Sequence, residues 1–76
     1  MRILITGGAG YVGSACLRYV AEQGHEVMAY DSLAMGHRGA VDGHPLVEGD
    51  IADTASLTKT LQEFGADAVV HFAAAT

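Results

Sequence analysis

Hydrophobic residues cluster in short blocks along the chain, and their spacing predicts four strands and two helices. Strands are predicted where apolar and β-branched residues run together, over residues 2–6, 26–30, 46–49 and 68–73. Helices are predicted where apolar positions recur every three or four residues, between residues 10 and 24 and between residues 53 and 65. Residues 31–45 have neither period and are rich in glycine, which predicts a long loop with room for one helical turn.

Each predicted helix has an apolar face and a glycine that ends it. The first ends at Gly24, and its apolar positions are Val12, Ala15, Cys16, Tyr19 and Val20. The second is capped by Asp53 and ends at Gly65, with Leu57, Leu61 and Phe64 on one face. We expect the side chains of Tyr19 and Phe64 to lie in the core.

The order strand, helix, strand, loop, strand, helix, strand predicts an α/β fold with parallel strands joined by right-handed crossovers. In such a doubly wound, or Rossmann, sheet the first and fourth strands are neighbours. The fourth strand, AVVHFA, would then expose an apolar edge. We therefore expect residues 1–76 to be a truncated Rossmann fold, the N-terminal part of the domain of a longer protein.

Composition and charge narrow the set of partners. Half of the 76 residues are apolar, 17% are charged, and the formal net charge is −5. Nucleic acid and anionic membranes are therefore not expected as partners, and a bound phosphate would have to be held by backbone amides. The single cysteine and the short apolar run at the N-terminus predict a cytoplasmic protein.

The histidines do not predict a metal site. His25, His37, His44 and His71 include no pair at helical ligand spacing. His71 alternates with apolar neighbours in the fourth predicted strand, so we expect it to be an interior histidine with a hydrogen-bond partner.

The stretch ITGGAGYVG, residues 5–13, contains two overlapping glycine fingerprints. Gly8, Gly10 and Gly13 have the spacing G-x-G-x-x-G, and Gly7, Gly10 and Gly13 have the spacing G-x-x-G-x-x-G. Either one, between a strand and a helix, predicts a turn that binds a pyrophosphate through helix amides and the helix dipole. Glycine turns also occur for structural reasons alone, and spacing does not decide between the two fingerprints.

Two acidic residues follow the predicted strands and are candidates for binding adenosine. Asp31 lies 31 − 13 = 18 residues after the last glycine, where a carboxylate binds the ribose hydroxyls and repels a 2′-phosphate, which favours NAD over NADP. The alternative is a solvated turn residue. Asp50 and Ile51 could hold the adenine through the carboxylate and the amide; alternatively, Asp50 and Asp53 merely cap the next helix.

Several motifs together resemble the extended short-chain dehydrogenase/reductase family, and within it the nucleotide-sugar 4-epimerases. They are ITGGAGYVGS, Asp31, the loop DSLAMGHRGAV, VEGDIAD and DAVVHFAAAT, which span the whole chain. The family fingerprint T-G-x-x-G-x-x-G is matched by Thr6, Gly7, Gly10 and Gly13, which selects that spacing and makes Gly8 an incidental turn residue.

The resemblance implies a set of NAD contacts. Backbone at Tyr11 and Val12 would meet the pyrophosphate, and Asp50 and Ile51 the adenine. The ribose would be wrapped by Asp31, Ser32, Leu33, Ala34, Met35 and Gly36. The segment beneath the ribose and pyrophosphate, leading to the nicotinamide, would be Phe72, Ala73, Ala74, Ala75 and Thr76.

The resemblance also implies what the full-length parent does. It would interconvert UDP-glucose and UDP-galactose by transient oxidation at the sugar 4-position, as a homodimer, with a Ser/Thr and a Y-x-x-x-K pair that lie beyond residue 76. No catalytic residue is therefore expected in this chain. Ser32 in place of the family's Asn, and Thr76 in place of a frequent Lys, leave other nucleotide-sugar epimerases, dehydratases and decarboxylases open. A non-catalytic nucleotide-binding module is the alternative from another class.

Overall fold

The computed structural model describes residues 1–34 and 36–72, and the elements follow the predicted order. They are β1 (Arg2–Thr6), α1 (Tyr11–Glu22), β2 (Glu26–Asp31), a 3₁₀ turn η1 (Arg38–Val41), β3 (Leu46–Glu48), α2 (Thr54–Phe64) and β4 (Ala68–His71). The first strand has its predicted bounds, and the ends of the other three differ by one or two residues from the prediction. Residue 73, the last of the predicted fourth strand, lies outside the described residues.

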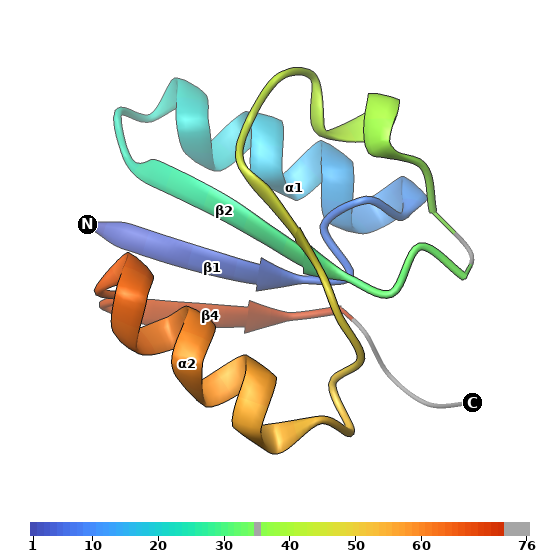
Figure 1. Ribbon diagram of the computed structural model, residues 1–76. Coiled ribbons are helices and arrows are strands. Elements are labelled where there is room, and N and C mark those ends of the chain that lie inside the picture. Colours follow the sequence, from blue (N-terminus) through green and yellow to red (C-terminus); the bar gives the residue numbers. More distant parts are fainter. Residues whose placement is uncertain (35, 73–76) are drawn as a thin grey trace.

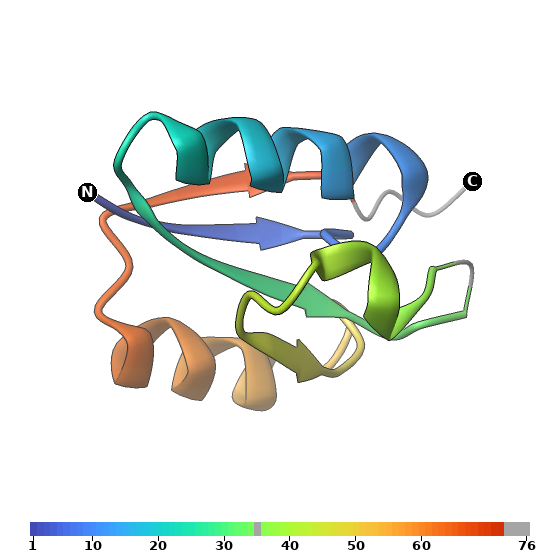
Figure 2. The same ribbon diagram turned by 90° about the horizontal axis from the view of Figure 1, so that it is seen from above.

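The four strands form one parallel sheet in the order β3-β2-β1-β4 (Figure 1). Leu4 in the central strand β1 is in register with Met28 of β2 and with Val69 of β4. Helix α1 covers one face of the sheet and α2 covers the opposite face, as Figure 2 shows from above. This arrangement confirms the predicted α/β, Rossmann-like fold, with the first and fourth strands side by side.

The core lies on both sides of β1, as its apolar sequence predicts. Leu4 and Ile5 have no exposed surface, although their side chains alternate between the two faces of the sheet. Leu17 of α1 and Tyr30 of β2 are also completely buried. A strand buried on both faces places its carboxyl end, where the glycine turn begins, in a fixed position.

The predicted apolar face of α1 is partly wrong. Tyr19 was expected in the core but is 63% exposed, and Val12 is 60% exposed. The buried side of α1 is Gly13, Ser14 and Leu17. A Cβ on Gly13 would lie 2.7 Å from the carbonyl carbon of Gly7, so the helix approaches the turn through its smallest residue. With Gly13, Ser14 and Leu17 on the buried side, Tyr19 lies on the outward side of the helix.

Two other side chains are less buried than predicted. His71 is exposed at the end of β4 rather than interior, although its Nδ1 lies 2.6 Å from the Oγ1 of buried Thr6. Phe64 is half-buried at the end of α2. His71 is the last residue of β4, an edge strand of this sheet, and Phe64 lines a hollow beside Arg2 and Met28.

The helix ends follow the predicted signals. Asp53 caps α2, its Oδ1 accepting a hydrogen bond from the Ser56 amide at 3.1 Å. Gly65 ends α2 in the left-handed conformation with φ +70°, and Gly24 follows α1 with φ +91°. These φ angles favour glycine because it has no Cβ. The helices therefore start and stop where the sequence indicates.

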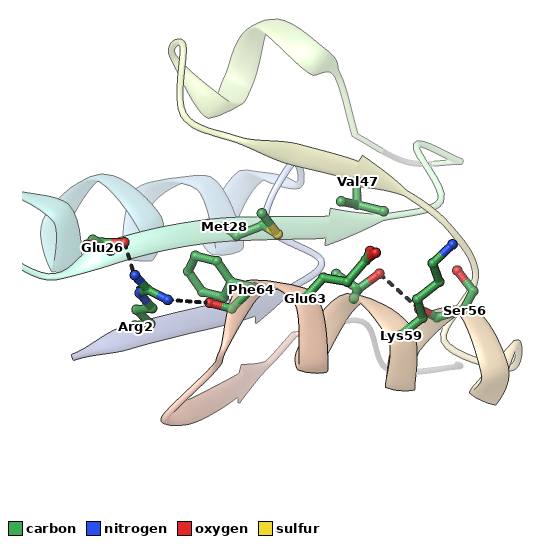
Figure 3. Close-up of a pocket in the computed structure, with 9 residues that line it drawn as sticks. Arg2, Glu26, Met28, Val47, Ser56, Lys59, Glu63 and Phe64 are labelled. Atoms are coloured by element: carbon green, nitrogen blue, oxygen red, sulfur yellow. Dashed lines mark hydrogen bonds and ion pairs between the residues drawn. The ribbon is translucent and has the colours of Figure 1, made fainter.

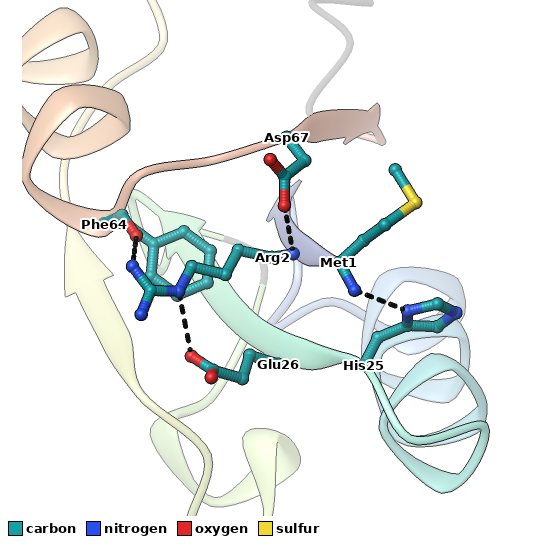
Figure 4. A network of polar contacts seen from close by, with 6 residues as sticks. All are labelled: Met1, Arg2, His25, Glu26, Phe64 and Asp67. Atoms are coloured by element: carbon teal, nitrogen blue, oxygen red, sulfur yellow. Dashed lines mark hydrogen bonds and ion pairs between the residues drawn. The ribbon is translucent and has the colours of Figure 1, made fainter.

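The amino edge of the sheet, opposite the glycine turn, is joined by polar contacts (Figure 4). The Arg2 side chain binds the Glu26 carboxylate at 3.2 Å and the Phe64 carbonyl at 3.2 Å, and the Arg2 amide donates to Asp67 at 2.8 Å. The N-terminal amine lies 3.2 Å from Nδ1 of His25. These contacts connect β1, β2 and the turn before β4, and leave the carboxyl edge for the loops.

The free edge of β4 generates a first prediction. Among residues 1–34 and 36–72, β4 has one strand neighbour, β1, and its Val69 is 48% exposed, a combination that promotes pairing between chains. We expect the 76-residue chain to self-associate at micromolar concentration, and Val69→Lys to shift it toward monomer because a charge on an edge opposes pairing. Sedimentation velocity measures both; a monomeric wild-type chain would show that the edge is protected.

The rotation of α1 gives a second prediction, measured in the Val69→Lys background. Leu17→Ala should lower the free energy of unfolding by about 2–5 kcal/mol, because it leaves a cavity in the core. Tyr19→Ala should change it by no more than about 0.5 kcal/mol, because the side chain is mostly exposed. Urea denaturation followed by circular dichroism compares them, and equal losses would mean that Tyr19 packs inside.

Candidate functional site

Those of the predicted site residues that the structure describes lie together at the carboxyl edge of the sheet. The glycine turn follows β1, Asp31 is the last residue of β2, and Asp50 lies just after β3. Since these three strands are parallel neighbours, their carboxyl ends meet at one edge (Figure 1). Phe72 follows β4 at the same edge, and its amide donates to the Thr6 carbonyl at 2.9 Å.

The glycine turn depends on the backbone conformation of Gly7 and on close packing at Gly8. Gly7 has φ +72°, which favours glycine, and its amide donates to the Tyr30 carbonyl at 2.8 Å. Gly8 was expected to be an incidental turn residue, but a Cβ there would lie 2.7 Å from Cβ of Ala29. Gly8 is a turn residue as expected, and its missing Cβ also lets the turn pack against β2. Gly10 then donates to the Gly7 carbonyl at 3.1 Å.

The N-terminus of α1 presents amides that have no helical acceptor. Gly10 is the N-cap and provides no side-chain cap, and the first helical bond runs from the Ser14 amide to the Gly10 carbonyl at 2.9 Å. The amides of Tyr11, Val12 and Gly13 therefore point out of the helix end. The first turn contains no acidic residue, so the positive end of the helix dipole is not neutralised locally. This end of α1 suits an anion.

Asp31 is a buried carboxylate with two backbone partners. The residue is 8% exposed, its Oδ2 accepts from the Ala9 amide at 2.9 Å and its Oδ1 accepts from the Leu33 amide at 2.8 Å. The alternative of a solvated turn residue is therefore wrong. A carboxylate has about four acceptor positions, so these two bonds leave capacity for hydroxyl donors such as those of a ribose.

The loop after Asp31 folds back onto the glycine turn. A Cβ on Gly36 would lie 2.5 Å from the Ala9 carbonyl oxygen, and the His37 amide donates to that oxygen at 3.1 Å. Leu33 has φ +65°, and Ser32 is exposed with its Oγ 3.4 Å from the Ala34 amide. Met35 lies outside the described residues.

Ala9 is a residue that the sequence reasoning missed. Its amide binds Asp31 and its carbonyl binds the loop through His37, so both of its backbone groups join the two parts of the site. Only backbone groups take part, which is why residue type gives no signal for this role. The sequence feature that could have indicated the role of Ala9 is the glycine at position 36, where the loop approaches the Ala9 carbonyl.

Asp50 and Asp53 shape the turn between β3 and α2. Asp53 is the N-cap of α2, which confirms the capping interpretation for that residue. Asp50 accepts from the Ala52 amide at 2.9 Å through Oδ1, and its carbonyl accepts from the Asp53 amide at 3.0 Å. Ile51 is half-buried between them. The turn is joined to β2 by the Gly49 amide, which donates to the Asp31 carbonyl at 3.0 Å.

Phe72 is 39% exposed, and residues 73–76 lie outside the described residues. A hollow of about 520 Å³ separates α2 from β2 and β3 (Figure 3), lined by Met28, Val47 and Phe64 among others, and none of the predicted cofactor residues lines it.

Within residues 1–34 and 36–72, no three His, Cys, Asp or Glu side chains lie together as a metal site would require, and no helix has the length and apolar character of a membrane span.

Comparison with known proteins gives consistent matches over nearly the whole chain. The model of the NAD dependent epimerase/dehydratase family matches residues 3–76. A UDP-glucose 4-epimerase of Lactobacillus helveticus is 45% identical over 75 residues, which cover 97% of this chain and 23% of that protein. The chain thus spans about a quarter of the length of such relatives.

Solved structures agree with this comparison. The UDP-glucose 4-epimerase of Brucella ovis, in complex with NAD, superposes with a TM-score of 0.94 at 43% identity, covering 99% of this chain and 23% of that one. A dTDP-glucose 4,6-dehydratase of Bacillus anthracis, also in complex with NAD, gives a TM-score of 0.89 at 28% identity, covering 99% of this chain and 27% of that one. With the family match over residues 3–76, these likenesses establish that the chain belongs to the NAD dependent epimerase/dehydratase family.

Proposed function

We propose that residues 1–76 form the N-terminal part of the NAD-binding Rossmann domain of an epimerase that interconverts UDP-glucose and UDP-galactose. The observation that carries the proposal is the buried Asp31 carboxylate, hydrogen-bonded to the glycine turn beside the uncapped end of α1. A ribose acceptor and an anion site are thereby adjacent, which is what a dinucleotide requires.

Each part of NAD can be assigned to a group of residues at the carboxyl edge of the sheet. The pyrophosphate would bind the amides at Tyr11 and Val12, next to the closely packed Gly7, Gly10 and Gly13. The ribose hydroxyls would donate to Asp31 within the loop of residues 31–36. Asp50 and Ile51 would hold the adenine, and Phe72 to Thr76 would lead to the nicotinamide. When bound, NAD supplies hydride transfer, and this chain's residues bind and orient it.

NAD rather than NADP is the proposed cofactor because of the local charge. A 2′-phosphate on the ribose would be placed against the Asp31 carboxylate, which is 8% exposed and cannot be screened fully by water. Arg38, the nearest arginine along the chain, forms an ion pair with Glu48 at 2.7 Å. It is therefore engaged elsewhere in the loop rather than with a phosphate.

The reaction itself belongs to the full-length parent. Its proposed substrate is a UDP-sugar, its catalytic residues follow residue 76, and it acts as a cytoplasmic homodimer. The likeness to UDP-glucose 4-epimerases at over 40% identity supports this reaction over the dehydratase reaction, whose representative is 28% identical. The 76-residue chain alone would be inactive.

The activity is tested with the full-length protein. Incubation with UDP-galactose and NAD should produce UDP-glucose, measured by ¹H NMR of the sugar anomeric region, and the 76-residue chain serves as the inactive control. Loss of water from a nucleotide sugar would instead assign a dehydratase. NAD binding with no conversion of any nucleotide sugar would support a non-catalytic module.

The role of Asp31 gives a separate prediction. Asp31→Ala in the full-length protein should weaken NAD binding about 10- to 100-fold, the effect of losing hydrogen bonds to a charged group. Asp31→Ala with Ser32→Arg should improve NADP binding, because a cation replaces the repelling carboxylate. Isothermal titration calorimetry measures both affinities.

A matched control separates charge from loop structure. Asp31→Asn retains one carbonyl oxygen for a backbone amide but removes the charge, so it should raise the NADP-to-NAD affinity ratio with a smaller loss of stability than Asp31→Ala. An unchanged ratio in both variants would show that Asp31 does not face the ribose.

A further inference from the structure

Tyr30 connects the two parts of the candidate site that are proposed to bind the ribose and the adenine. It is the residue before Asp31, it has no exposed surface, and its hydroxyl lies 3.0 Å from the Asp50 carbonyl and 3.1 Å from the Ser56 Oγ. Its own carbonyl accepts from the Gly7 amide at 2.8 Å. One residue thus contacts the glycine turn through its backbone and the β3–α2 turn through its side chain.

The fit between Tyr30 and the β3–α2 turn is close. A Cβ on Gly49 would lie 2.6 Å from the ring carbon Cζ of Tyr30, so the turn can rest on the ring only with glycine at that position. Asp50 follows Gly49 directly, and the Tyr30 hydroxyl binds its carbonyl. The ring therefore limits how closely the β3–α2 turn can approach β2. The hydroxyl holds the backbone of Asp50 in the turn through its hydrogen bond.

We propose that Tyr30 is a positioning residue for the adenine end of the cofactor. It acts by holding the backbone of Asp50, so that the Asp50 carboxylate and the Ile51 amide lie at a fixed distance from the ribose-binding Asp31. This inference rests on the proposed function. It assigns control over the affinity for adenosine to Tyr30, a buried residue that is not among the proposed cofactor contacts.

The hydrogen bonds of the Tyr30 hydroxyl indicate that it does more than fill space. Phenylalanine would fill the same volume, yet a buried tyrosine hydroxyl must find a partner. A hydroxyl has one proton and donates to one oxygen at a time, and the Asp50 carbonyl is the shorter contact. The Ser56 hydroxyl is the neighbouring partner on α2, so removing it leaves the contact with Asp50 in place.

The test uses the apo form of the full-length protein and three ligands. NAD and ADP-ribose contain adenosine, whereas nicotinamide mononucleotide does not. Tyr30→Phe should weaken NAD and ADP-ribose by a similar factor, up to about tenfold for the loss of one hydrogen bond, and leave nicotinamide mononucleotide unchanged. Calorimetric titration, with competition for the weak ligand, gives the three affinities.

Three variants serve as controls. Tyr19→Phe, the same change at a residue that is 63% exposed, should leave every affinity unchanged. Ser56→Ala should have a smaller effect than Tyr30→Phe, because the contact with Asp50 remains. Gly49→Ala, which pushes the turn away from the ring without altering Tyr30, should reproduce the selective loss of the adenosine ligands and provides a second route if Tyr30→Phe folds poorly.

The outcomes separate this inference from the proposed function. Unchanged affinities in both Tyr30→Phe and Gly49→Ala would overturn the positioning role, while the wild-type affinity for NAD and its dependence on Asp31 would still support the function. An equal loss for all three ligands would also overturn it, because a general loss of structure would then explain the effect. If wild-type protein bound none of the adenosine ligands, both proposals would be wrong.

Discussion

The hydrogen bond between the Asp31 carboxylate and the Ala9 amide is the contact on which the candidate site depends. It joins the end of β2 to the glycine turn, and the second oxygen of the same carboxylate holds the start of the following loop at Leu33. A buried carboxylate must be paired with donors, and here the donors belong to the two loops that it joins. The group proposed to bind the ribose therefore also fixes the geometry of its surroundings.

Close backbone packing provides the second constraint. Gly8 against β2, Gly13 against Gly7 and Gly36 against Ala9 each occupy a position where a Cβ would collide with a neighbour. These contacts bring β1, α1 and the loop after β2 closer together than larger residues allow. They leave the end of α1 open, so its amides remain available to an anion. The same small residues thus set the packing and leave this helix end open.

The sequence predicted the fold well because local and long-range signals agree. Apolar runs, helix caps at Asp53 and Gly65 and the alternation of elements each favour the same parallel sheet. The errors occurred where tertiary contacts override periodicity. Tyr19 follows the apolar period of α1, but it lies on the outward side of the helix. The roles of Ala9 and Tyr30 rest on backbone groups and on a core hydroxyl, which sequence patterns do not identify.

A crystal structure of the full-length protein with NAD would test the proposed site most directly. We expect it to show the adenosine ribose on the Asp31 carboxylate, the pyrophosphate at the amides of Tyr11 and Val12, and the adenine beside Asp50 and Ile51. A cofactor bound away from the carboxyl edge of the sheet, or a ribose that does not contact Asp31, would contradict the proposed site.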